Sequence, residues 1–205
     1  MASKKTKRST ETKKKKGGTK GKGSAFERFI AKEFSKWIAN DPNVEPLIWR
    51  SSNSGGTFTT NRLRGNARQA KMASDLVSID ERSKWFMDIF SIECKTGYKS
   101  ANIFATFKDS KSDVLKSFWE QASRDAALSN RIPMLVFRPL GNSELIGLPY
   151  DLVKTKLYNL IPKQFVIIRF NDSLSILFLC KLSDFLKSYT AENLKELFFQ
   201  NGQDL

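Results

Sequence analysis

Apolar residues recur at three- and four-residue intervals near the start of the chain, which predicts an amphipathic helix over residues 24–39. The apolar positions of this stretch are Phe26, Phe29, Ile30, Phe34, Trp37 and Ile38. Ser24 is followed three residues later by Glu27, which is the spacing of a capping box and marks Ser24 as the N-cap. Pro42 disfavours helical conformation in the residue before it, so the helix should end near Ala39.

Short apolar runs between polar segments indicate β-strands over residues 47–49, 75–79, 85–95 and 134–137. Polar residues 80–83 separate the second and third runs, so we expect these two strands to form an antiparallel hairpin around a turn. The segment 51–73 is polar, basic and contains glycine. A loop of this length inside a compact domain is usually functional or mobile.

Helices and strands alternate in the rest of the chain. Helical spacing covers residues 113–129, and the C-terminal third adds three helices (151–160, 183–189 and 191–200) and two strands (165–170 and 175–180). This order predicts an α/β fold with a mixed central sheet flanked by helices. Because we find no repeat and no linker, we expect one domain over residues 23–205, with a core at 23–138 and a C-terminal extension at 139–205.

The chain is strongly basic, because 35 lysines and arginines oppose 21 acids in 205 residues, a net charge of +14. Ten basic side chains and one acid lie in residues 1–22, so this segment carries nine of the fourteen charges. It has almost no apolar residues, and we expect a disordered tail. The tail is either an electrostatic arm that gathers nucleic acid or a solubilising or localisation segment. It lacks an amphipathic face, which argues against a membrane partner.

The rare residue types exclude several kinds of chemistry. The chain has no histidine and two cysteines, which excludes histidine-dependent catalysis and common zinc sites. No apolar run is long enough to span a bilayer, and the Lys-rich N-terminus is unlike a signal peptide. We therefore expect a soluble, cytoplasmic protein in which carboxylates, lysines and a metal ion carry any catalysis.

One segment combines a carboxylate and a lysine, the residue types that are left to carry catalysis. On a strand, Glu93 and Lys95 project from the same face about 7 Å apart, while Cys94 points the other way. Asp75 begins the neighbouring strand, so two carboxylates and a lysine can converge at one edge of the sheet. Such a set suits Mg²⁺, which one or two carboxylates commonly hold, and the backbone carbonyl of Cys94 can add an oxygen. The structural alternatives are a surface ion pair for Glu93 and Lys95 and a turn role for Asp75.

The sequence from Asp75, through seventeen intervening residues, to Glu93-x-Lys95 resembles the signature of the PD-(D/E)xK nuclease superfamily, with Ser74 where the motif has proline. The resemblance is greatest to the archaeal-type Holliday junction resolvases. The segments that carry it lie at residues 22–28, 50–56, 73–77, 92–96, 119–121 and 132–136.

The resemblance implies a restriction-endonuclease-like core and roles for five residues. Asp75 and Glu93 would bind Mg²⁺, for which Mn²⁺ can substitute, and Lys95 would act on the attacking water. Glu27 would lie near the metal and Gln121 would support the site. Glu27 has the alternative role of a capping-box partner, and Gln121 that of an ordinary polar residue on a helix.

Basic residues outside this motif are candidates for binding DNA. Those in the long loop either close over a phosphate backbone or form a solvated loop, and they are Arg62, Arg64, Arg68 and Lys71. Arg50 and Ser52 lie close in sequence to the metal-binding motif and are candidates for contacting a phosphate near the cleaved bond.

These observations favour a Mg²⁺-dependent endodeoxyribonuclease that hydrolyses DNA phosphodiesters. A Holliday junction or branched-DNA resolvase is the first hypothesis, and it implies a homodimer because two strands are cut symmetrically. A site-specific homing or restriction-type endonuclease is the second. The alternative from another class is a non-catalytic DNA-binding protein in which the carboxylates are structural.

Overall fold

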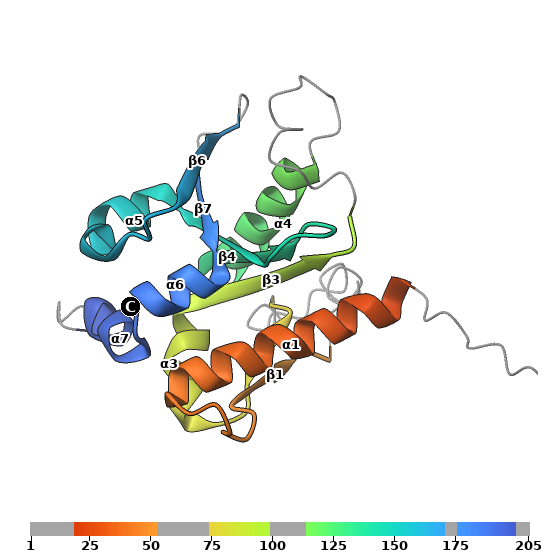
Figure 1. The fold of residues 1–205 in the computed structure, drawn as a ribbon, viewed down its shortest axis with the longest axis vertical. Helices are drawn as coiled ribbons and strands as arrows, with labels where there is room; N and C mark the ends of the chain where they lie inside the picture. Colours follow the sequence, from red (N-terminus) through yellow and green to blue (C-terminus); the bar gives the residue numbers. More distant parts are fainter. Residues whose placement is uncertain (1–18, 53–73, 99–113, 171–175, 200–205) are drawn as a thin grey trace, which may run out of the picture.

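The structure, a computed structural model, describes residues 19–52, 74–98, 114–170 and 176–199. Its main sheet has five strands in the order β3-β4-β5-β7-β6 (Figure 1). These strands are β3 (Phe90–Thr96), β4 (Ile132–Arg138), β5 (Leu145–Pro149), β6 (Phe165–Arg169) and β7 (Ile176–Lys181). The β3–β4 pair is parallel and the other pairs are antiparallel, so the α/β fold with a mixed central sheet is confirmed.

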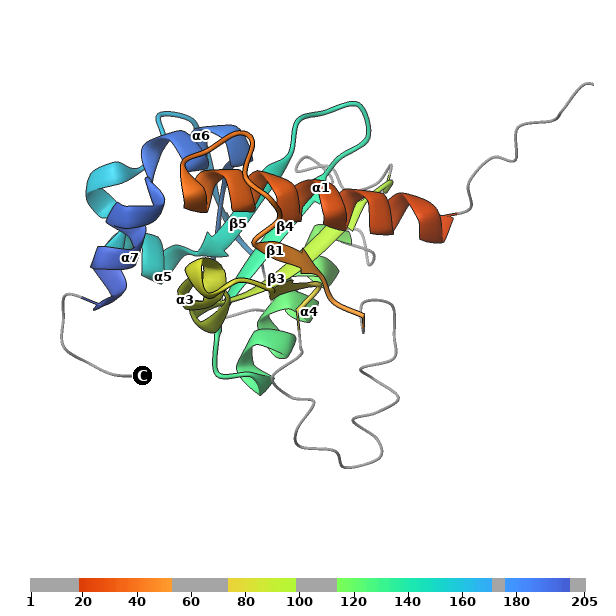
Figure 2. The same cartoon turned by 90° about the horizontal axis from the view of Figure 1, so that it is seen from below.

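Helices cover both faces of this sheet. They are α1 (Thr19–Ala39), α3 (Glu81–Ile89), α4 (Val114–Leu128), α5 (Tyr150–Lys156), α6 (Leu182–Ser188) and α7 (Ala191–Phe199), with a 3₁₀ turn at Tyr158–Leu160. In both views α4 lies on the opposite side of β3 from α1 (Figures 1 and 2), and Figure 1 shows α3 on the same side as α1. No helix in the described part of the chain is both long and apolar enough to cross a membrane.

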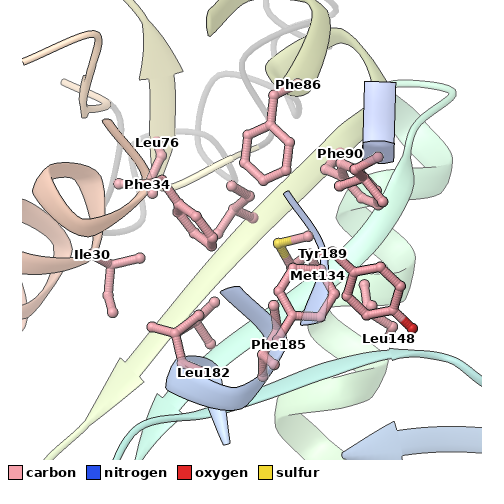
Figure 3. Packing of buried hydrophobic residues seen from close by; sticks show 14 of the residues in the cluster. Ile30, Phe34, Leu76, Phe86, Phe90, Met134, Leu148, Leu182, Phe185 and Tyr189 are labelled. Atoms are coloured by element: carbon pink, nitrogen blue, oxygen red, sulfur yellow. The ribbon is translucent and has the colours of Figure 1, made fainter. Parts of the chain in front are cut away.

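Side-chain alternation along the strands divides the interior into two apolar clusters. On β4, Met134 and Val136 join the larger cluster between the sheet and α1, α3 and α6, whereas Leu135 and Phe137 pack with α4 on the other face. Figure 3 shows the larger cluster, in which the rings of Phe34 of α1 and Phe86 of α3 are tilted against each other, with their centroids 5.1 Å apart. The two clusters hold the sheet between the helix layers.

A small second sheet joins α1 to the edge of the main sheet near β3. It pairs β1 (Ile48–Arg50) antiparallel with β2 (Leu76–Ser78). The buried Ser35 hydroxyl of α1 donates to the Ala31 carbonyl and accepts hydrogen bonds from the backbone N–H groups of Leu47 and Ile48. This hydroxyl fixes β1 against α1.

The expected hairpin of residues 75–79 and 85–95 is wrong. Residues 85–89 belong to α3, and Asp80 is its N-cap, accepting a hydrogen bond from the Arg82 N–H, so residues 80–83 are not a hairpin turn. β2 pairs with β1, and β3 pairs with β4. The apolar residues of 85–89 suit either a strand or a short buried helix, and packing of Phe86 into the core selects the helix.

The expected start of the first helix is also wrong, whereas its end at Ala39 is confirmed. α1 begins at Thr19, five residues before Ser24, so Ser24 is inside the helix and cannot be its N-cap. The last four residues of the expected disordered tail, 19–22, are therefore helical. The prediction for residues 1–18 lies outside the described residues.

In the C-terminal third the predicted helices and strands are confirmed within a few residues, but β5 was not predicted. β5 pairs with β4 on one side and with β7 on the other, so strands from residues 23–138 and 139–205 share one sheet. Its sequence, Leu-Ile-Gly-Leu-Pro, has glycine and proline, which are uncommon inside strands.

Candidate active site

Alternation along β3 separates its polar side chains from its apolar ones. Phe90, Ile92 and Cys94 belong to the larger apolar cluster, as the sequence predicts. Glu93 and Lys95 therefore project from the opposite face of the strand, the face covered by α4 (Figure 1). A carboxylate and an ammonium group thus lie side by side beneath a helix.

Glu93 is buried and has two polar partners. Its Oε1 accepts a hydrogen bond of 2.9 Å from Nε2 of Gln121 on α4 and forms an ion pair with Nζ of Lys95. Burial raises the pKa of the Glu93 carboxyl, and the lysine only partly opposes this. Burial lowers the pKa of Lys95, but the Glu93 charge and hydrogen bond outweigh it, so the net pKa is raised and the amine stays protonated.

Asp75 lies next to this pair, directly before β2. Its Oδ2 accepts a hydrogen bond of 2.8 Å from the Cys94 N–H, and its own N–H donates to the Ile92 carbonyl at 2.9 Å. Burial and then the charge of Glu93 raise the pKa of Asp75 to about 8. The two carboxylates are therefore close enough to repel each other.

Ser74 holds this arrangement together and was not predicted as a site residue. Its hydroxyl accepts from the Ile92 N–H at 3.0 Å and from the Leu76 N–H at 3.3 Å, and it donates to the Ile92 carbonyl at 3.1 Å. It thus links the start of β2 to the middle of β3. Its position directly before Asp75 was the available signal.

Glu27 faces the same site from α1. Its Oε2 accepts a hydrogen bond of 2.9 Å from Nε of Arg50 at the end of β1, and the side chains form an ion pair. The charge of Glu27 contributes to raising the pKa of both Asp75 and Glu93. The structure therefore brings Glu27 to the carboxylates, and its interpretation as a capping-box partner is wrong because α1 begins earlier.

Cys94 has no feature of a nucleophile. Its side chain is buried in the larger apolar cluster, and burial raises its pKa well above the ordinary value for a thiol. Its backbone, by contrast, faces the site through the N–H that binds Asp75.

The predicted DNA contacts fall in two groups. Arg50 is engaged with Glu27 at the site, and Ser52 is exposed two residues further along. Arg62, Arg64, Arg68 and Lys71 lie outside the described residues.

Asp75 and Glu93 are the candidate side-chain donors for a divalent cation. Within the described ranges no group of three or more His, Cys, Asp and Glu side chains is placed to hold a metal. The half-buried Asp75 and the buried Glu93 nevertheless form a close pair of carboxyl groups, and neither Oδ1 of Asp75 nor Oε2 of Glu93 accepts a hydrogen bond from the described residues. Two carboxylates with free oxygens fit Mg²⁺, which commonly keeps several waters.

An aspartate before one strand, a Glu-x-Lys strand beside it and a mixed sheet between helices define the PD-(D/E)xK class of nucleases. The model of the family described as "Phage putative PDDEXK endonuclease" matches residues 18–196, and the chain belongs to this family. No curated protein and no solved structure gave a significant match.

Proposed function

We propose that this protein is a Mg²⁺-dependent endodeoxyribonuclease acting on branched DNA, as a Holliday junction resolvase does. The single observation that carries the nuclease activity is the close pair of the half-buried Asp75 and the buried Glu93, with Lys95 against Glu93, at the edge strand β3. Membership of an endonuclease family supports the same activity. The junction substrate rests on the resemblance of the motif order to the resolvases.

Asp75, Glu93 and the Cys94 carbonyl are the proposed ligands of Mg²⁺, with Mn²⁺ as a substitute. When bound, the ion would polarise the scissile phosphate and lower the pKa of a coordinated water. Its charge would also relieve the repulsion that raises the pKa of Asp75. Binding should therefore favour the ionised form of both carboxylates.

Lys95 is proposed to orient the water and to stabilise negative charge on the phosphoryl group. The raised pKa of its amine favours this electrostatic role over that of a general base, because the group is protonated near neutral pH. Gln121 would hold Glu93 through its hydrogen bond. Glu27 would orient Arg50, which then presents its guanidinium to a phosphate.

Cutting two strands symmetrically requires two sites, so we also propose a homodimer. The edge strand β6 supports this: Phe165, Val166 and Ile167 are 45%, 39% and 44% exposed, and no described strand pairs with its outer edge. Two copies paired antiparallel about Ile167 would place each Phe165 opposite the partner's Arg169, a favourable cation–π arrangement.

Sedimentation tests this arrangement. The wild type should sediment as a dimer, and Ile167→Lys, which puts a charge at the centre of the paired edge, should sediment as a monomer.

The test of the function is cleavage of labelled DNAs in Mg²⁺ by the wild type, Lys95→Ala and a control, Lys84→Ala, which removes an exposed lysine from α3. The panel holds a four-way junction, a flap, a single strand and a linear duplex. We expect paired symmetric nicks in the junction from the wild type and the control, and none from Lys95→Ala, which should still bind.

Other outcomes would correct the proposal in defined ways. Cutting of long duplex at one preferred site would replace the resolvase with a homing or restriction-type endonuclease. Undiminished cleavage by Lys95→Ala would show that the active site is not the one assigned here to Asp75, Glu93 and Lys95. Salt-sensitive binding with no cleavage of any substrate would favour a non-catalytic DNA-binding protein.

A further inference from the structure

Trp49 is an exposed tryptophan whose indole has no hydrogen-bond or ring partner in the described residues. Its side chain is 42% exposed, whereas Trp119 is 1% exposed. Trp37 donates from Nε1 to the Tyr189 carbonyl at 2.7 Å, and its ring lies 6.5 Å from that of Trp85. Within the described ranges the indole of Trp49 makes neither a hydrogen bond nor a ring contact. Its exposure therefore has no explanation in the packing of the fold.

Trp49 lies on the outer face of the small sheet. It pairs with Val77 on β2, while its neighbour Ile48 and the neighbouring Leu76 are fully buried on the inner face. Ile79, two residues beyond Val77, is 58% exposed. The outer face thus presents an indole beside aliphatic side chains.

Trp49 is close along the chain to residues of the candidate active site. The next residue, Arg50, binds Glu27, and the N–H of the following residue, Ser51, donates to the Asp75 carbonyl at 2.7 Å. Two residues of extended strand span about 7 Å, so Trp49 lies roughly that distance along β1 from the residue paired with Asp75. This is comparable to the length of one nucleotide of extended single strand.

We propose that Trp49 is a stacking platform for an unpaired nucleobase next to the scissile phosphate. An exposed indole stacks on any base, and such stacking is independent of sequence. In uninterrupted duplex both faces of each base are already covered by neighbouring bases, so the platform selects DNA with an unstacked base. A flap offers such a base in its single-stranded arm, and a four-way junction offers one where base pairs open at its branch point. This inference rests on the proposed function and specifies its substrate class.

The test is binding without divalent metal, so that it does not depend on cleavage. A flap and a linear duplex of matched sequence are titrated with the wild type, Trp49→Ala, Trp49→Phe and the control Ile79→Ala, which trims an exposed aliphatic side chain directly after β2. Trp49→Ala should weaken flap binding about tenfold and duplex binding less than twofold. Trp49→Phe should keep most of the flap affinity, and Ile79→Ala should resemble the wild type.

Intrinsic fluorescence gives a second readout. Flap DNA should quench tryptophan emission of the wild type, and this quenching should be largely lost in Trp49→Phe although binding persists. Equal weakening of flap and duplex by Trp49→Ala, or unchanged binding, would overturn the inference. If Trp49→Ala selectively loses flap binding but the wild type cleaves no DNA, the stacking platform stands and the proposed nuclease activity is refuted. If the wild type cleaves DNA but Trp49→Ala binds the flap normally, only the stacking platform is refuted.

Discussion

At the scale of single residues, Asp75 makes the stability of the metal-free protein depend on pH. Its pKa is raised to about 8 by burial and by the charge of Glu93, so between about pH 4 and pH 8 the folded state holds a proton that the unfolded state has released. Stability should therefore fall as pH rises through this window. Asp75→Asn removes the ionisation and should be more stable than the wild type at pH 8 by at least about 1.4 kcal/mol, the equivalent of one pKa unit.

Urea unfolding in chelator at pH 5, 6, 7 and 8 measures this difference. Asp41→Asn is the control, because Asp41 is exposed and its Oδ1 accepts a backbone hydrogen bond that asparagine can also accept. Its stability should follow the wild-type curve. Parallel curves for the wild type and Asp75→Asn would show that Asp75 is ionised throughout this range.

Gln121 is expected to act through Glu93. Its Nε2 donates to the oxygen that Lys95 also contacts, so it orients the carboxylate from α4. Gln121→Ala should reduce cleavage about 10- to 100-fold at limiting Mg²⁺, the range seen when groups that orient metal ligands are removed. Raising the Mg²⁺ concentration should restore part of the rate.

The matched control is Glu120→Ala, which changes the neighbouring exposed residue of α4. Its rate should equal that of the wild type at every Mg²⁺ concentration. A loss in Gln121→Ala that is the same at low and high Mg²⁺ would argue against a role in orienting a metal ligand.

At the scale of elements, Ser74 connects β2 to β3. Ser74→Ala deletes the acceptor for the N–H groups of Ile92 and Leu76, and Ile92 is fully buried. A buried donor without a partner costs about 1–3 kcal/mol, so urea unfolding should show a loss of that size. Ser74→Thr keeps the hydroxyl and should recover most of the stability. Wild-type stability in Ser74→Ala would mean that water replaces the hydroxyl.

The β3 and α3 elements show what local pattern can and cannot predict. The alternation of Phe90, Ile92 and Cys94 against Glu93 and Lys95 follows from the two-residue period of a strand, which is a local property. The segment 85–89 has apolar residues that fit either period, and only the packing of Phe86 against α1 and β3 selects the helix. Asp80 is the N-cap of this helix, but aspartate is equally common in turns, so this local signal did not distinguish a helix start from a hairpin turn.

At the scale of the whole molecule, the charge of the N-terminal segment should control DNA affinity. Replacing Lys13, Lys14, Lys15 and Lys16 by glutamine removes four positive charges. If all four neutralise phosphates, the slope of log K against log salt should become less negative by about 3.6. Binding titrations from 50 to 300 mM salt measure this slope. An unchanged slope would identify the segment as a solubilising or localisation tail.

The motif residues and the alternation that places them on one face of a strand could be predicted from the sequence by itself, because residue identity, strand alternation and net charge are local or additive properties. The carboxylates, Lys95 and the α/β pattern were all recognisable without coordinates. The meeting of Glu27 with Arg50, and of Glu93 with Gln121, was decided only by the tertiary structure. These partners are 23 and 28 residues apart, and no local rule brings them together. Burial of the site, which raises the pKa of Asp75, likewise depends on every element packed around it.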